Sequence, residues 1–177
     1  IEKFVVRFLK RFGDPKNYPA LKVIDYGNEL EYALDRQEGG GHHEITDPNS
    51  QVTQPVKLAD LLAYMRAVHA AVKQHAPHLA LTGGFSSVNY AERLWPHLKG
   101  LVDYIDAHWY PKWGPRKEWL VRAKAVADRL GLPMALAEYP SISQEFDEVL
   151  EEADQLRLIA SLYWNHAAST DNETAHA

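Results

Sequence analysis

The sequence of 177 residues contains no cysteine. This absence excludes disulfide bonds, thiolate metal sites and a cysteine nucleophile, and it agrees with either redox compartment. The chain also has no excess of basic residues, because 19 Lys and Arg stand against 24 Asp and Glu, for a net charge of −5. Nothing in this balance attracts a polyanion, so we expect no nucleic-acid partner.

Long apolar stretches are missing as well. The longest hydrophobic runs have the length of strands, and residues 1–11 carry charges throughout, where a signal peptide would have an apolar segment. We therefore expect no membrane span and no signal peptide in this chain, and both an extracellular and a cytoplasmic location agree with the sequence. Aromatic residues, by contrast, reach 11% and include five Trp, more than a small core needs.

Helical and strand-like patterns alternate along the chain. Apolar residues at helical spacing predict helices within residues 4–12, 58–72, 89–98, 119–130 and 149–163, and Gly13, Gly100 and Gly131 are placed to end three of them. Between the helices lie four short apolar runs that are typical of buried parallel strands, at residues 21–25, 79–82, 101–109 and 133–137. The order αβαβαβαβα predicts an α/β fold with parallel strands, either a barrel or a doubly wound sheet.

Polar residues follow each of the four predicted strands. Ligands bind at the C-terminal ends of parallel strands in both kinds of fold. Those ends carry Asn28 with Glu29, Gly83-Gly84-Phe85, His108-Trp109-Tyr110, and Glu138 with Tyr139. Paired carboxylates across a cavity suit the cleavage of a glycosidic bond, where one protonates the leaving oxygen and the other stays ionised. Asn28 could then bind the 2-hydroxyl of the sugar, and Tyr110 could donate a hydrogen bond to Glu138 and keep it ionised.

These motifs also resemble a known family. Gly27-Asn28-Glu29 after one strand, His108-Trp109-Tyr110 after a later strand and Ala137-Glu138 after the next are similar to clan A of the retaining glycoside hydrolases. The resemblance implies a partial (β/α)8 TIM barrel from about strand four to helix seven, a carbohydrate substrate and no cofactor. It implies that Glu29 is the acid/base, that Glu138 is the nucleophile, and that His108 and Tyr110 support Glu138.

The resemblance leaves the first three strands and the eighth strand of the clan without a counterpart. We expect residues 1–168 to form the partial-barrel catalytic domain and residues 169–177 to form a disordered tail. Trp164 continues the pattern of the last helix, which argues against its use as the sugar-stacking Trp of an eighth strand.

The sequence also supports expectations for several other residues. Trp113 and Tyr139 are expected to border the mouth of the site and stack on sugar rings, whereas Trp109 either stacks or packs between strand and helix. Asp106 shares a strand face with His108 and is expected to support it. Gly83 and Gly84 are expected to make a tight turn, and the stretch His42-His43-Glu44 a solvated loop without metal.

Two other functions remain open at this point. The chain could be a non-catalytic carbohydrate-binding or inactive barrel fragment, in which the aromatic residues bind sugar and no turnover occurs. It could also be a metal-dependent α/β enzyme with Glu29, His108 and Glu138 as ligands.

Overall fold

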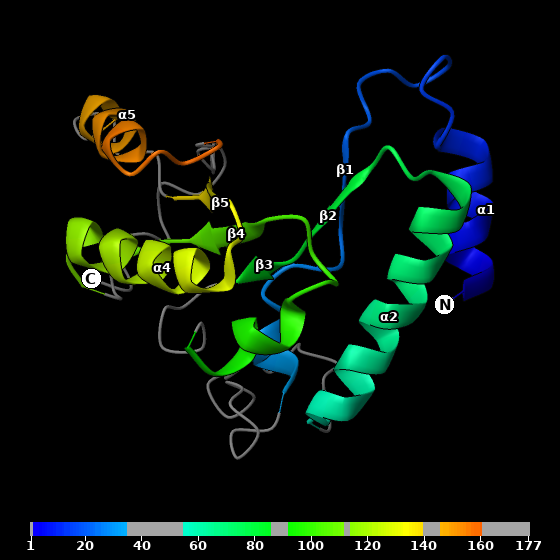
Figure 1. The fold of residues 1–177 in the computed structure, drawn as a ribbon, viewed down its shortest axis with the longest axis horizontal. Coiled ribbons are helices and arrows are strands. Elements are labelled where there is room, and N and C mark those ends of the chain that lie inside the picture. Colours follow the sequence, from blue (N-terminus) through cyan, green and yellow to red (C-terminus); the bar gives the residue numbers. More distant parts are fainter. Residues whose placement is uncertain (1, 35–54, 86–91, 112–113, 140–145, 161–177) are drawn as a thin grey trace, which may run out of the picture.

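The strands in the described part of the chain are parallel and follow one another in sequence order. The computed structural model describes residues 2–34, 55–85, 92–111, 114–139 and 146–160 (Figure 1). Within them, one sheet pairs β1 (Val23–Asp25) with β2 (Ala80–Thr82), and a second has the order β3 (Gly84–Phe85), β4 (Ile105–His108), β5 (Met134–Glu138). Only Gly83 separates β2 from β3, so the two sheets continue one another. The unshuffled order is that of a barrel and excludes a doubly wound sheet.

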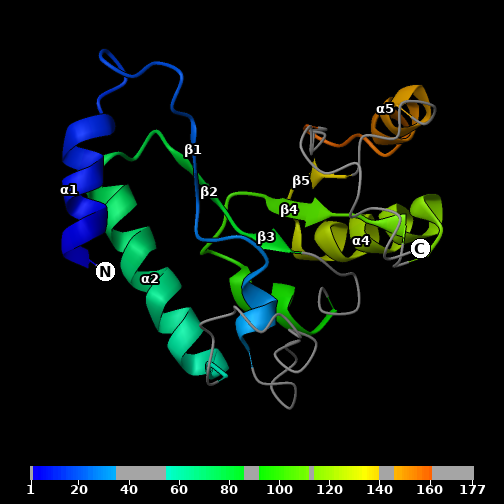
Figure 2. The same ribbon diagram turned by 180° about the vertical axis from the view of Figure 1, so that it is seen from behind.

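Helices lie between the strands, as the alternating pattern predicts. The described residues include the α-helices α1 (Glu2–Phe12), α2 (Leu58–His75), α4 (Arg116–Leu130) and α5 (Phe146–Gln155) and the 3-10 helices η1 (Leu30–Ala33) and η4 (Trp95–Leu98). Both views show α1 and α2 side by side at one end of the molecule, and α4 and α5 at the other end (Figures 1 and 2). None of the described helices is long and apolar enough to cross a membrane.

The core forms where the helices face the strands. Apolar residues three and four positions apart on α2 and α4 are buried, and they meet buried strand residues of which several are fully inaccessible: Leu81, Ile105, Met134 and Leu136. Burying such side chains is the main stabilising term of the fold, at roughly 25 cal/mol per Å² of apolar surface. The expected buried face of the third helix, with Leu94, Trp95 and Leu98, is confirmed.

Two helices differ from the sequence-based expectation. The third ends in the 3-10 turn η4, which contains Pro96 near its start, and residue 89 lies outside the described part. The last helix stops at Gln155, not near residue 163, because Arg157 adopts a left-handed backbone conformation with φ 53°. Beyond it the chain runs beside β5, with Ile159 N–H donating to Met134 O (2.9 Å) and Leu136 N–H to Ala160 O (3.0 Å). Trp164 lies outside the described residues.

Glycine ends the helices in two ways. Gly131 has φ 70° and its N–H caps α4, and Gly100 has φ 83°, as expected for left-handed caps. The same expectation is wrong for Gly13, whose φ is not positive. Gly13 is instead required by space, since a Cβ there would lie 2.5 Å from the carbonyl oxygen of Leu9.

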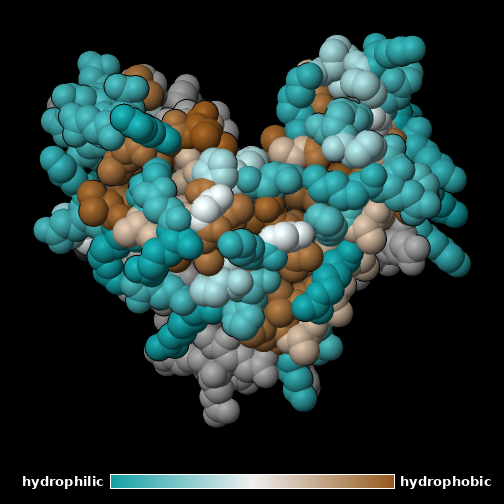
Figure 3. All heavy atoms as spheres, in the orientation of Figure 1, coloured by the Kyte–Doolittle hydropathy of each residue, from teal (hydrophilic) through white to brown (hydrophobic). Residues whose placement is uncertain are grey.

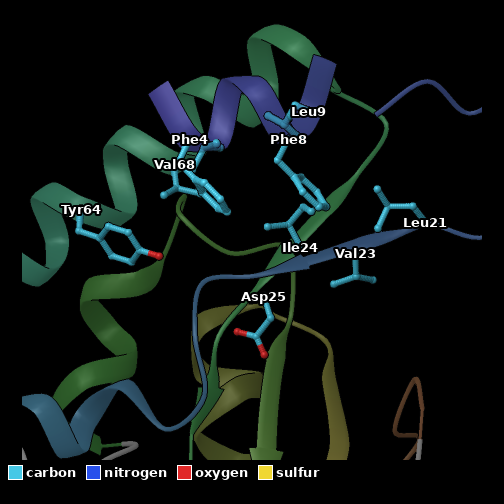
Figure 4. A pocket seen from close by; sticks show the side chains of 10 residues that line it. Phe4, Phe8, Leu9, Leu21, Val23, Ile24, Asp25, Tyr64 and Val68 are labelled. Carbon is cyan, nitrogen blue, oxygen red and sulfur yellow. The ribbon is translucent and has the colours of Figure 1, made fainter. Parts of the chain in front are cut away.

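An apolar groove follows the edge of β1. Figure 4 shows Phe4 and Phe8 of α1 above Ile24, with Asp25 on the other side of the strand. The groove has a volume of about 640 Å³, and the Phe4 side chain is 74% exposed. Apolar side chains also gather in the hollow between the two ends of the molecule (Figure 3). Among the described residues, β1 has a strand partner on one edge only.

The buried strand residue Leu81 provides a test of this core. Leu81→Ala removes a side chain with 0% exposure and leaves a cavity, so we expect the free energy of unfolding to fall by about 2–5 kcal/mol. Urea denaturation measures the change, and Val121→Ala on α4, where the side chain is 47% exposed, serves as the control, with a change within about 0.5 kcal/mol. Equal effects of the two substitutions would contradict the placement of Leu81.

Candidate active site

The turn after β1 directs the first candidate carboxylate. Asp25 Oδ1 accepts a hydrogen bond from Gly27 N–H (2.9 Å), and Gly27 has φ 155°. Glu29 follows in a left-handed conformation, with φ 48° and ψ 50°, at the start of η1. Tyr26 anchors this turn through two hydrogen bonds. Its backbone N–H donates to Thr82 O (2.9 Å), and the hydroxyl of its buried side chain donates to Leu101 O (2.5 Å). These bonds tie the turn that precedes Glu29 to β2 and to the backbone at Leu101.

The second candidate carboxylate lies beside His108 on neighbouring strands. The parallel register of β4 and β5 pairs His108 with Glu138, after a register irregularity between Ala107 and His108. The N–H of Trp109 donates to the carbonyl oxygen of Glu138 (2.9 Å), which holds the two strand ends together. Paired residues of neighbouring strands point to the same face, so the imidazole and the carboxylate face one another.

One nitrogen of His108 lies next to both candidate carboxylates. Its Nδ1 is 3.3 Å from Glu29 Oε1 and 3.4 Å from Glu138 Oε2, and the Tyr110 hydroxyl donates a hydrogen bond to Glu138 Oε1. The two glutamate oxygens can therefore be no further apart than about twice the distance to Nδ1. The His108 side chain is only 4% exposed, whereas Glu29 and Glu138 retain 24% and 17%, so the carboxylates form the accessible part of the site.

The surrounding charges decide the protonation of the buried groups. Burial alone would lower the pKa of His108, but the hydrogen bond to Glu29 and the charges of Glu138, Asp106 and Glu29 outweigh it and raise the pKa above its usual value. Burial raises the pKa of Asp106 to about 7, partly opposed by the charge of His108. The surrounding carboxylates therefore favour the charged form of the imidazole.

Gly84 and Asn28 lie on the remaining side of His108. A Cβ on Gly84 would lie 2.9 Å from His108 Nε2 and 3.5 Å from Asn28 Oδ1. Gly84 belongs to β3 and has no positive φ, so its expected role in a tight turn is wrong. The absence of a side chain instead allows the imidazole to pack against the strand backbone, and Asn28 is exposed beside it.

The aromatic residues expected at the mouth are placed differently. Tyr139, directly after β5, is only 2% exposed, so its ring presents no open face for sugar. Trp109 is 5% exposed, donates from Nε1 to Gly114 O (3.1 Å) and lies under the guanidinium of Arg116, 5.5 Å from the ring centroid. It therefore packs between strand and helix. Trp113 lies outside the described residues.

Two site residues were missed by the sequence-based prediction. Asp25 accepts a hydrogen bond from Gly27 N–H and points away from α1 (Figure 4). Gly84 leaves room for the ring of His108. A charged residue at the end of the apolar run 21–24 was a usable signal for Asp25. No sequence signal distinguishes a glycine in a turn from one under an imidazole. Among the residues that the structure describes, no group of three or more His, Asp or Glu side chains has the geometry to hold a metal ion.

Comparisons with known proteins bear on the fold. No family model matches the sequence, and no curated protein matches it. Among solved structures, a β-glucuronidase from Bacteroides uniformis superposes with a TM-score of 0.59 at 16% identity, over 93% of this chain and 21% of that one. The GH53 catalytic domain from Ignisphaera aggregans gives 0.58 at 17% identity, over 92% of this chain and 52% of that one.

A third solved structure agrees with the first two. An intracellular xylanase from Thermoanaerobacterium saccharolyticum superposes with a TM-score of 0.58 at 12% identity, over 92% of this chain and 54% of that one. The fold is part of a (β/α)8 barrel. This confirms the fold class expected from the sequence, and the chain spans about half of the GH53 domain and of the xylanase, and less of the glucuronidase.

The contact between Gly84 and His108 is testable by a double-mutant cycle. Gly84→Ala should lower the free energy of unfolding by about 1–3 kcal/mol, because the added Cβ overpacks the imidazole. In a His108→Ala background the same substitution should cost clearly less, since the obstructing ring is gone. Thermal and urea unfolding of the four proteins measure the coupling. Additive effects would show that Gly84 is needed for another reason.

Proposed function

We propose that this protein is a retaining O-glycoside hydrolase that acts on a β-linked glycan or glycoside through Glu29 and Glu138. The main observation behind this proposal is that both carboxylates contact His108 Nδ1 at the C-terminal end of the strands. Retaining enzymes have carboxyl groups about 5 Å apart, whereas inverting enzymes separate them by roughly 6.5–9.5 Å to admit a water. Two oxygens that contact one nitrogen support the shorter spacing.

The hydrogen bonds support different roles for the two glutamates. The Tyr110 hydroxyl donates a hydrogen bond to Glu138, as suits a nucleophile held in place for attack. Glu29 is the more exposed of the two carboxylates, as suits an acid that meets the leaving group. Asn28, next to Glu29, is exposed and would bind the 2-hydroxyl of the sugar.

The reaction then proceeds in two displacements. Glu138 attacks the anomeric carbon while Glu29 donates its proton to the departing glycosidic oxygen, which leaves a glycosyl ester on Glu138. In the second step Glu29, now ionised, takes a proton from water. The water oxygen attacks the anomeric carbon, the ester bond to Glu138 breaks, and the configuration is retained. The roles of Tyr110 and His108 are to stabilise the charge on Glu138 before and after the ester exists.

Glu138→Ala tests the proposed nucleophile. On a dinitrophenyl β-glycoside chosen from a panel of sugars, this variant should lose turnover, and added azide should restore it with a product of inverted configuration, because the small anion attacks from the vacated side. The anomeric configuration is read by NMR. Glu118→Ala, an exposed glutamate on α4, is the matched control and should keep wild-type rates. An azide product of retained configuration would reverse the two roles.

Glu29→Ala tests the proposed acid/base. Cleavage of a glycoside with a poor leaving group should fall by about 10²–10⁴-fold, whereas a dinitrophenolate, which needs no proton, should still leave in a rapid first turnover. The reaction should then stall at the ester, and azide should release a retained product. Stopped-flow absorbance measures the burst. Wild-type rates in this variant would show that Glu29 takes no part in the reaction. Glycan binding without any turnover in the wild-type protein would favour a non-catalytic carbohydrate-binding function.

A further inference from the structure

Asp106 is a buried carboxyl group for which the two displacements have no use. It lies two residues before His108 on β4, so both side chains point to the same face of the strand. Its side chain is 7% exposed, and its Oδ1 has no hydrogen-bond partner among the described residues. That oxygen lies 3.8 Å from His108 Nε2, on the far side of the ring from the two glutamates. An unpaired buried oxygen is costly, so its position needs a reason.

The imidazole is the centre of a group of acids. Glu29 and Glu138 contact its Nδ1, Asp106 faces its Nε2, and Asp25 on β1 also acts on its charge. Within the described chain, Glu29, Glu138 and Asp106 each form an ion pair with His108. The neighbouring phenols, which are neutral at ordinary pH, belong to Tyr104 and Tyr110. His108 is therefore the positive charge on which this group depends.

A neutral imidazole could not donate a hydrogen bond both to the two glutamates and to an ionised Asp106. It carries a proton on one nitrogen only, so a proton on Nε2 would leave Nδ1 as a lone pair facing two carboxylates. Only the doubly protonated ring presents N–H groups to the glutamates and to Asp106 together. Burial opposes that charge, and a carboxylate at Nε2 offsets part of this cost. The backbone at Gly84, against which Nε2 packs, keeps the ring from turning away.

We propose that Asp106 is a positioning residue that holds His108 with a proton on both ring nitrogens, so that Nδ1–H always faces Glu29 and Glu138. This inference rests on the proposed function for its catalytic consequence, but the protonation of His108 can be measured without any substrate. Asp106 touches no reacting atom, and it acts through the imidazole alone.

The titration of Asp106 gives the expected pH dependence. Burial raises its pKa to about 7, so its negative charge is present above that pH and is lost as the pH falls through it. The imidazolium itself is lost as the pH rises through the raised pKa of His108, and the negative charge of Asp106 delays that loss. The part of the glycosidase activity that depends on the charged ring should therefore decline on the alkaline side, with Asp25, Glu29 and Glu138 as the other acids near the ring.

The deciding experiment is an NMR titration of the histidine side-chain nitrogens in the whole protein. The His108 signal is assigned by its loss in His108→Asn. In the wild-type protein both of its ring nitrogens should carry protons at pH 7, and a single protonated nitrogen would overturn the inference without the need for any other variant. In Asp106→Asn the titration midpoint of His108 should move to lower pH, because the amide keeps the shape and removes the charge.

The matched control is Asp103→Asn. Asp103 precedes β4, pairs with Lys73 on α2 (3.1 Å) and has no contact with His108, so its variant should leave the His108 titration unchanged. In a parallel assay on the dinitrophenyl glycoside, Asp106→Asn should lower kcat/KM about tenfold and shift the alkaline limb of the pH profile to lower pH, whereas Asp103→Asn should not. An unmoved His108 titration in a folded Asp106→Asn protein would overturn the positioning role. A moved titration in a protein that cleaves no glycoside would uphold that role and refute the proposed function.

Discussion

The contact of one imidazole with carboxylates from three parts of the chain is the interaction on which the site depends. Glu29 follows β1, Glu138 ends β5, and Asp106 lies on the same strand as His108. Buried like charges repel strongly, so these acids can share a small volume only if a cation lies between them. Because the strand ends carry them, the register of the sheet and the charge of the ring must both be correct for the site to exist.

The sheet satisfies this requirement through several backbone contacts. The register of β4 and β5 sets His108 opposite Glu138, and the bond from Trp109 N–H to Glu138 O fixes that edge. On the other side, Tyr26 links the turn before Glu29 to β2 and to the backbone at Leu101. These links use main-chain groups and buried rings, which move less than exposed side chains, so the distances between the functional groups are well determined by the fold.

The sequence predicted the strands and their polar ends well because both depend on local patterns. Short apolar runs followed by Glu29, His108 and Glu138 located three of the strand ends, and parallel pairing then required them to meet, whereas β3 was expected to be a turn. The end of α5 was missed because Leu156 and Ala160 continue the helical spacing, whereas the left-handed turn at Arg157 is decided by tertiary contacts with β5. Tyr139 was misplaced because the burial of its ring depends on tertiary packing, which its place directly after Glu138 does not show.

Glu29 has a left-handed backbone conformation that disfavours a side chain, although the proposed reaction needs a carboxylate at this position. A residue with a side chain costs about 1–3 kcal/mol in the left-handed region, where glycine is at ease and asparagine is tolerated. Populations of variants selected only for resistance to heat would therefore drift toward Gly or Asn at position 29. Under the proposed mechanism, populations selected for turnover would retain glutamate there and recover the lost stability elsewhere in the barrel. A comparison of the two outcomes would separate what this turn needs in order to fold from what it needs in order to react.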